Sequence, residues 1–138
     1  MAKTFQLDVL TPERLFYYGP AEAITIQGLN GELTVLADHI HMVAPLQVGS
    51  IRIKKDGAWR EAFNSEGFLE VMKPGVVVYV QACEWPEDID VVRAEAALRR
   101  AEERLRQRRS INEYKGSRIA VARAMARLRV THQKLNLD

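Results

Sequence analysis

Four arginines near the carboxyl end of the chain have a spacing that would gather positive charge on helical surfaces. Arg93 and Arg100 are seven residues apart, and Arg123 and Arg127 are four apart, so each pair would share one helix face. Guanidinium groups match phosphate oxygens in a planar, forked geometry, so two such pairs folded together would suit a triphosphate. The plainer alternative is that Asp90 caps a helix beside a solvated basic face, since an Asp–Arg pair three residues apart contributes only about 0.2–0.5 kcal/mol. Spacing alone favours this alternative.

The other chemistry-bearing residues form no catalytic set in the sequence. There is no Gly-rich phosphate loop, no nucleophile–base pair and no cluster with metal-ligand spacing. Cys83 is the only cysteine and shares no nucleophile motif with His39, His41 or His132, so we expect an inert apolar residue on a strand. We therefore predict a non-catalytic protein without catalytic or metal-binding residues. The rival class is an enzyme with a small-molecule pocket in its first domain, which turnover by the isolated chain would reveal.

The first part of the chain alternates apolar and polar residues, as half-buried strands do. This pattern covers Phe5–Val9, Ile24–Ile26, Leu33–Val35, Val48–Ile53 and Phe68–Val71. The continuous apolar run Val76–Val80 predicts a strand that is covered on both faces. Turn chemistry separates the runs at Thr11-Pro12, Gly19-Pro20, Asn30-Gly31, Asp56-Gly57 and Lys73–Gly75. Asn30-Gly31 and Asp56-Gly57 predict hairpins, and many short strands at regular spacing predict a β-sandwich or barrel.

The pattern becomes helical after Glu84–Asp88, where Pro86 cannot continue a central strand and Asp88 can cap a helix. A first apolar stripe, with steps of three and four, comprises Val91, Ala94, Leu98, Ala101 and Leu105. A polar break with Ser110 or Asn112 as capping residue precedes a second stripe of Ile111, Tyr114, Val121, Met125, Leu128 and Leu135. Two narrow seams of this kind predict an antiparallel helical hairpin with little apolar area of its own, so we expect it to be marginally stable.

The predicted fold is therefore all-β plus all-α in two domains: an N-terminal β-sandwich at residues 1–85 and a C-terminal α-helical hairpin at residues 86–138. Residues 1–85 carry 7 Lys+Arg and 10 Asp+Glu, and residues 86–138 carry 13 and 8, so the halves have formal charges of −3 and +5. The amino terminus does not resemble a signal peptide, and no apolar run reaches the roughly 20 residues of a membrane span. Balanced charge without an aromatic platform argues against nucleic-acid binding.

Three segments of the sequence resemble the epsilon subunit of bacterial F-type ATP synthases. Gly31–His39, continued by Val43–Leu46 and Gly49, is similar to a signature of that subunit's sandwich, and Gly67–Val71 is similar to a second. Ile89–Ala94 is similar to the nucleotide-binding motif of the ATP-binding epsilon subunits, such as those of thermophilic bacilli, in which Ile or Leu precedes Asp-x-x-Arg-Ala. The resemblance spans the whole chain in order.

The resemblance implies a non-catalytic rotor subunit that lies on the cytoplasmic side of the cell membrane without inserting into it. It implies binding to the gamma subunit and the c-ring through the sandwich, with Phe16–Tyr18 either in the core or in a patch for gamma. It also implies a mobile hairpin that inhibits ATP hydrolysis when it extends toward the catalytic beta and alpha subunits. Arg104, Arg106, Arg108 and Arg109 would then face acidic surface on those subunits, or else form an ordinary soluble helix end.

A regulatory ATP, with or without Mg²⁺, would favour the folded hairpin according to the same resemblance. Its expected site comprises Glu84, Ile89, Asp90, Arg93, Ala94, Arg100, Arg123 and Arg127. Ala94 would let the base approach the backbone, and Glu84 or Asp90 would accept from the adenine amino group or fix an arginine. The alternative is a purely structural rotor coupler with a fixed hairpin and no ligand.

Overall fold

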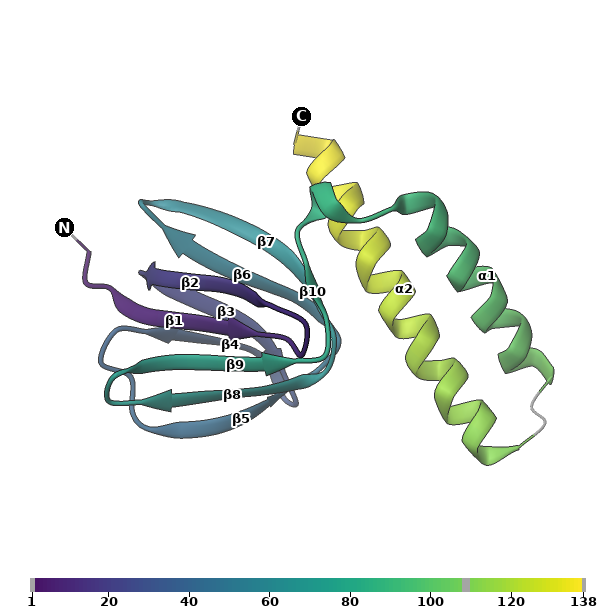
Figure 1. Ribbon diagram of the computed structural model, residues 1–138, viewed down its shortest axis with the longest axis horizontal. Coiled ribbons are helices and arrows are strands. Elements are labelled where there is room, and N and C mark those ends of the chain that lie inside the picture. The colour runs from purple at the N-terminus through teal and green to yellow at the C-terminus, as the bar shows by residue number, and fades with distance from the viewer. Residues whose placement is uncertain (1, 108–109, 138) are drawn as a thin grey trace. The chain divides into compact units, whose positions relative to one another are not determined.

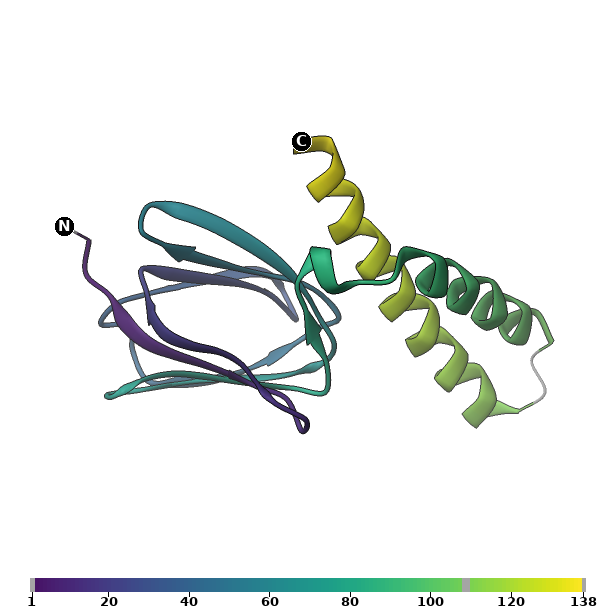
Figure 2. The same ribbon diagram turned by 45° about the horizontal axis from the view of Figure 1, so that its top comes forward.

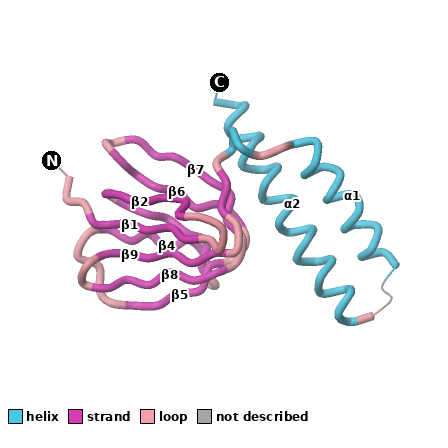
Figure 3. The backbone as a smooth tube through the Cα atoms, viewed as in Figure 1, coloured by secondary structure: helices cyan, strands magenta, loops and turns pink. Residues whose placement is uncertain are grey.

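The computed structural model describes residues 2–107 and 110–137, without the side chains of residues 133–137. The chain divides into two compact units, Met1–Glu84 and Trp85–Asp138, so the division falls one residue before the predicted boundary. The first unit consists of strands and the second of helices (Figures 1 and 3). The predicted fold class, a sandwich followed by a helical hairpin, is confirmed.

Two five-stranded sheets make up the first unit, and Figure 2 shows them as two layers. Sheet A has the order β2-β1-β9-β8-β5 and sheet B the order β10-β7-β6-β3-β4. The strands of sheet A are β1 (Phe5–Leu10), β2 (Leu15–Ala21), β5 (Met42–Leu46), β8 (Gly67–Met72) and β9 (Gly75–Val80). Those of sheet B are β3 (Ala23–Gly28), β4 (Gly31–Leu36), β6 (Gly49–Lys55), β7 (Ala58–Asn64) and β10 (Cys83–Glu84). Neighbouring strands are antiparallel except for the parallel pair β1 and β9.

The core of the sandwich lies between the sheets and is made mainly by alternate residues of the strands, although β3 and β7 also contain consecutive buried residues. Side chains from both sheets are fully buried there, among them Leu7, Val9, Ile24, Ile26, Val35, Ile51, Leu69 and Val78. These positions follow the predicted two-residue period, because successive strand residues point to opposite faces of a sheet. Cys83 is buried in β10, as expected for a strand-borne apolar residue. Burial raises the pKa of its thiol to about 12.

Two predictions for individual strands were wrong. Gly19-Pro20, predicted to be a turn, lies inside β2. Pro45, for which nothing was predicted, lies inside β5 in the same way. Both strands are at the edges of sheet A, where a proline need not donate a hydrogen bond to a further strand. The run Val76–Val80 forms β9 but is covered on one face only, because Tyr79 is 37% exposed while Val76, Val78 and Val80 are buried.

Two tight turns agree with their sequence signals. Asp56 and Gly57 have φ values of 52° and 77°, and positive φ at both positions is what a two-residue type I′ turn requires. They join β6 to β7 in register. Gly31, with φ of 115°, begins β4 after the β3–β4 turn. Both predicted hairpins are confirmed.

The second unit contains a short 3₁₀ helix, η1 (Pro86–Asp88), and the helices α1 (Val91–Gln107) and α2 (Ile111–Leu137). Asp88 does not cap α1, because it belongs to η1; Asp90 takes that place, its carboxylate accepting from the Arg93 N–H at 3.1 Å. Ser110 caps α2, since its hydroxyl accepts from the Glu113 N–H at 3.1 Å. Ser110 and Glu113 have the spacing of a capping box.

The two helices pack on each other through small side chains. In α1 the predicted stripe is confirmed: Ala94 and Ala101 are buried, and Val91, Leu98 and Leu105 are half-buried. In α2 the prediction was partly wrong, because Ile111 and Met125 are exposed, by 73% and 47%. The buried residues of α2 are instead Ser117, Ala124, Ala126, Val130 and Thr131, and the Leu135 side chain lies outside the described part of the chain. Tyr114, Val121 and Leu128 of the expected stripe are half-buried, and the small residues Ser117, Ala124 and Thr131, seven residues apart, are the ones fully buried beside them.

Candidate functional site

The amino end of α1 holds four of the eight expected nucleotide-site residues, Ile89, Asp90, Arg93 and Ala94. Ile89 is buried, and its N–H donates to the Pro86 carbonyl at 3.2 Å, which closes η1. The Asp90 carboxylate and carbonyl accept from the N–H groups of Arg93 and Ala94, so they start the helix. The Arg93 side chain is exposed, whereas Ala94 is buried in the seam. The helix-capping role of Asp90 is thus shown directly.

The positions of the remaining arginines follow from the hairpin's symmetry about its turn. Ala94 lies 13 residues before Gln107, the end of α1, and Ala124 lies 13 residues after Ile111, the start of α2. Because both helices rise by about 1.5 Å per residue, Ala94 and Ala124 are at similar heights along an antiparallel hairpin, to within the offset between the two turn-side helix ends. Ala101 and Ser117, each six residues from the turn-side helix ends, are level by the same argument.

Counted in the same way from the turn-side helix ends, Arg123 and Arg127 come near the height of the first turn of α1, where Asp90 and Arg93 lie. Both are half-buried, while Arg93 is exposed. Arg100 is exposed and lies six residues beyond Ala94, about 9 Å closer to the hairpin turn. By this count Asp90, Arg93, Arg123 and Arg127 fall within about one helical turn of each other along the hairpin axis, and Arg100 lies further along α1.

Glu84 belongs to the other unit, where it ends β10. It is half-buried and pairs with Phe63 of β7 in the sheet. Of the arginines expected near the hairpin tip, Arg104 is exposed on α1, and Arg108 and Arg109 lie outside the described residues. Arg106 pairs with Glu103 at 2.7 Å, and this hydrogen bond lowers the pKa of the Glu103 carboxyl.

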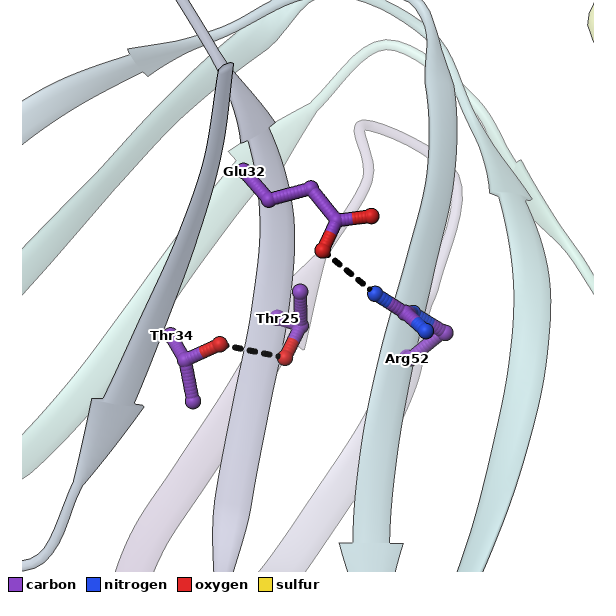
Figure 4. A network of polar contacts seen from close by, with 4 residues as sticks. All are labelled: Thr25, Glu32, Thr34 and Arg52. Atoms are coloured by element: carbon purple, nitrogen blue, oxygen red, sulfur yellow. Dashed lines mark hydrogen bonds and ion pairs between the residues drawn. The ribbon is translucent and has the colours of Figure 1, made fainter.

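The two outer faces of the sandwich differ sharply in chemistry. On sheet B, polar side chains satisfy one another: the Thr25 and Thr34 hydroxyls are 2.8 Å apart, and Arg52 donates to Glu32 at 2.8 Å (Figure 4). Sheet B also exposes Leu36 and Trp59, by 58% and 49%, but sheet A exposes a larger group of apolar side chains. They are Tyr18, Val43, Phe68, Met72 and Tyr79, and the Phe68 and Tyr79 rings stack with centroids 4.8 Å apart.

This exposed apolar surface, called here the sheet A outer face, was missed as a site from sequence. Phe16 and Tyr17, the other two aromatics of β2, are half-buried, so only Tyr18 of the three projects fully from the sandwich. The sequence did indicate this face. Val76–Val80 has apolar residues on both sides of the strand, which predicted that other residues would cover both sides. The described residues cover one side of β9, and the other side is available to a partner.

A cleft of about 520 Å³ opens at one end of the sandwich, lined by residues that include His39, His41 and Lys73. His39 contacts the Ile40 carbonyl through Nδ1 at 2.9 Å, which is a hydrogen bond within the loop after β4. Neither serine nor cysteine is among the lining residues. Across the described ranges 2–107 and 110–137, no three His, Cys, Asp or Glu side chains are grouped to hold a metal ion. Within the same ranges, neither long helix is apolar enough to cross a bilayer.

Comparison with known families gives two matches that together span most of the chain. Residues 4–86 match the family described as ATP synthase, Delta/Epsilon chain, beta-sandwich domain, and residues 87–132 match its long alpha-helix domain. The chain belongs to the ATP synthase delta/epsilon chain family. The resemblance drawn from the three sequence segments is confirmed.

Curated relatives of this delta/epsilon chain carry the name ATP synthase epsilon chain. The protein from Caldanaerobacter subterraneus subsp. tengcongensis is 50% identical over 131 residues, which cover 94% of this chain and 95% of that one. The protein from Ruminiclostridium cellulolyticum is 47% identical over 131 residues, covering 95% and 98%. A chain in the cryo-EM structure of the Euglena gracilis mitochondrial ATP synthase, OSCP/F1/c-ring in rotational state 1, superposes with a TM-score of 0.77. It covers 98% of this chain and 82% of that chain at 23% identity, so this likeness concerns the fold.

Proposed function

We propose that the protein is the epsilon subunit of a proton-translocating F-type ATP synthase, a non-catalytic part of the central stalk. The observation that carries the proposal is the match of both family domains, in order, to the two structural units. The solved structure with the same fold is part of an ATP synthase in an F1/c-ring assembly, which supports a place against gamma and the c-ring. As part of that complex the protein would be peripheral on the cytoplasmic side of the membrane.

The sandwich is the docking part in this proposal, and the hairpin is the regulatory part. The sandwich has a well-buried core and a group of exposed apolar side chains on sheet A, as a constitutive docking module requires. The hairpin packs through alanine, serine and threonine, which bury little apolar area, so little free energy opposes its rearrangement. An extended hairpin would restrain hydrolysis by meeting the catalytic beta and alpha subunits.

ATP is the proposed ligand of the folded hairpin. Helix lengths counted from the turn support a site in which Asp90, Arg93, Arg123 and Arg127 are at similar heights, so that one triphosphate would bridge the two helices. A ligand shifts a conformational equilibrium only through different affinities for its states, and extension would separate these arginines. ATP would therefore stabilise the folded form and raise the melting temperature of the chain. Arg100 would serve only if the ligand extends toward the hairpin turn.

Calorimetric titration of the isolated full-length chain with ATP tests this assignment. The test variant combines Asp90→Asn with Arg93→Ala, because asparagine retains helix-capping ability. If each residue provides a charged hydrogen bond of about 1.5–3 kcal/mol, the affinity should fall by at least tenfold. Glu95→Ala with Arg99→Ala is the matched control, since both residues are exposed on the same helix. No binding of ATP by the wild type at millimolar concentration would leave the structural rotor coupler as the better description.

A further inference from the structure

The sheet A outer face contains two carboxylates within its apolar surface. Strand register places Tyr18, Asp8, Val77, Glu70 and Val43 in one row across all five strands. The next row is Leu10, Tyr79, Phe68 and Pro45, which is wholly apolar except for the tyrosine hydroxyl. Asp8 and Glu70 are thus flanked by apolar side chains along the row and beside it.

These two carboxylates are not neutralised by cations of their own unit. Asp8 accepts a hydrogen bond from the Gln6 amide at 2.9 Å, and in the described part of the chain Glu70 has no ion-pair partner. Both are half-buried by their neighbours. On the opposite sheet, by contrast, Glu32 is paired with Arg52. The acidic groups of sheet A therefore keep their charge available to a partner.

An apolar partner that covered this face would desolvate both carboxylates. Burying an unpaired charge is strongly unfavourable, so a stable complex needs cationic groups opposite both positions. Asp8 and Glu70 lie on strands separated by β9, and twice the strand spacing of about 4.8 Å puts their Cα atoms about 10 Å apart. Val77 lies between them in the row.

We propose that Asp8 and Glu70 make the sheet A outer face specific for a protein surface with two Lys or Arg side chains about 10 Å apart on either side of an apolar residue. An α-helix that carries cations at positions i and i+7 has this spacing, since seven residues rise about 10.5 Å. The inference rests on the proposed function, because the partner is taken to be a central-stalk component of the ATP synthase. It adds to the proposed function the charge pattern by which the sheet A outer face would recognise that component.

Binding to the F1 sector of the synthase, stripped of this subunit, is the test. Full-length wild type, Asp8→Asn/Glu70→Gln and the control Glu32→Gln/Glu61→Gln are compared for Kd at about 0.05 M and about 0.5 M salt, since salt screens charge pairs. Both double variants remove two negative charges and keep side-chain shape, but the control acts on sheet B. Melting temperatures verify that all three proteins fold.

The Asp8→Asn/Glu70→Gln variant should bind at least about tenfold more weakly at low salt and should lose most of the salt dependence, while the control stays within about twofold of wild type. Binding of the sheet A variant within twofold of wild type would overturn the charge pattern and leave the proposed function standing. An equal loss in both variants would also overturn it, because it would show a general charge effect. Failure of the wild type to bind would refute the proposed function itself.

Discussion

A larger side chain at one buried position between α1 and α2 should weaken the packing of the two helices without affecting the sandwich. Ala101 is 2% exposed and lies level with Ser117, which is 4% exposed, so the two helices approach closely at this height. Ala101→Leu would place three additional carbon atoms where the structure has no room for them. The helices must separate locally, or the new side chain must adopt a strained rotamer.

The expected cost follows from the burial of this residue. Overpacking a filled interior costs about 1–3 kcal/mol. A hairpin that buries mainly small side chains has a small free energy of unfolding, so this cost is large for it. Each 1.4 kcal/mol changes an equilibrium tenfold, so the open population should rise by about five- to 150-fold. Ala122→Leu is the matched control, because Ala122 is exposed on α2 and the added carbon atoms would point to solvent.

Hydrogen exchange measured by mass spectrometry resolves the two units separately. In Ala101→Leu, amides of α1 and α2 should exchange faster by the same factor, while those of β1, β8 and β9 should keep wild-type rates. Ala122→Leu should match wild type throughout. Unchanged exchange in α1 and α2 of the Ala101→Leu protein would show that this seam does not hold the helices together, and the reasoning from small-residue packing would be refuted.

Three further predictions concern other single residues. Ser110→Ala removes the cap of α2 and should destabilise the hairpin by about 1 kcal/mol in denaturant titration. A Cβ at Gly67 would overlap the backbone carbonyl of Tyr79, so Gly67→Ala should lower the melting temperature of the sandwich, whereas Gly116→Ala, with open space around it, should stabilise α2 by up to about 1 kcal/mol. Burial raises the pKa of Cys83 to about 12, so its contribution to stability should be complete below about pH 8.5, where the unfolded thiol titrates, and should be lost as pH rises toward 12. Comparison of the pH dependence of unfolding with that of Cys83→Ala isolates this effect.

The local parts of the fold could be predicted because their causes are local. Alternation located the inward residues of β1, β3 and β8, and Asp56-Gly57 defined a turn through backbone preference alone. Ser110 was one of two capping candidates, and the structure selects it through a single hydrogen bond. Each of these features depends on residues a few positions apart, which a sequence displays directly.

The long-range parts could not be predicted in the same way. The parallel pairing of β1 with β9 joins residues about 70 positions apart, and no local pattern specifies it. Gly19-Pro20 gave a turn signal that the edge position of β2 overrides, since an edge strand tolerates the missing N–H. In α2, large apolar residues predicted the buried stripe, but close approach of the helices selects small ones.

The candidate nucleotide site also has a local part that the sequence could predict and a long-range part that it could not. The cap formed by Asp90 is local and is shown, whereas the heights of Arg93, Arg123 and Arg127 along the hairpin depend on where α1 ends and α2 begins. Arg100 shared a predicted face with Arg93, yet helical rise puts it about 10 Å away along the axis. Residue spacing alone indicates which arginines share a face of one helix. The alignment of α1 with α2 decides which arginines of the two helices lie at similar heights.

The sandwich and the hairpin differ in the apolar area that they bury. This difference would let one chain combine a stable docking domain with a hairpin that rearranges at a small cost in free energy. Fully buried leucine, isoleucine and valine side chains each contribute about 1.5–3 kcal/mol to the sandwich, but an alanine methyl contributes much less. A ligand that discriminates between hairpin states by about 5.5 kcal/mol would invert a 1:99 population, and a few charged hydrogen bonds to one triphosphate reach that size. A free energy of the same size would not unfold the sandwich, because its core is larger and its strands pair across the sequence. A small-residue hairpin attached to a sandwich with a large apolar core therefore suits the proposed function, in which ATP would move the hairpin while the sandwich stays docked.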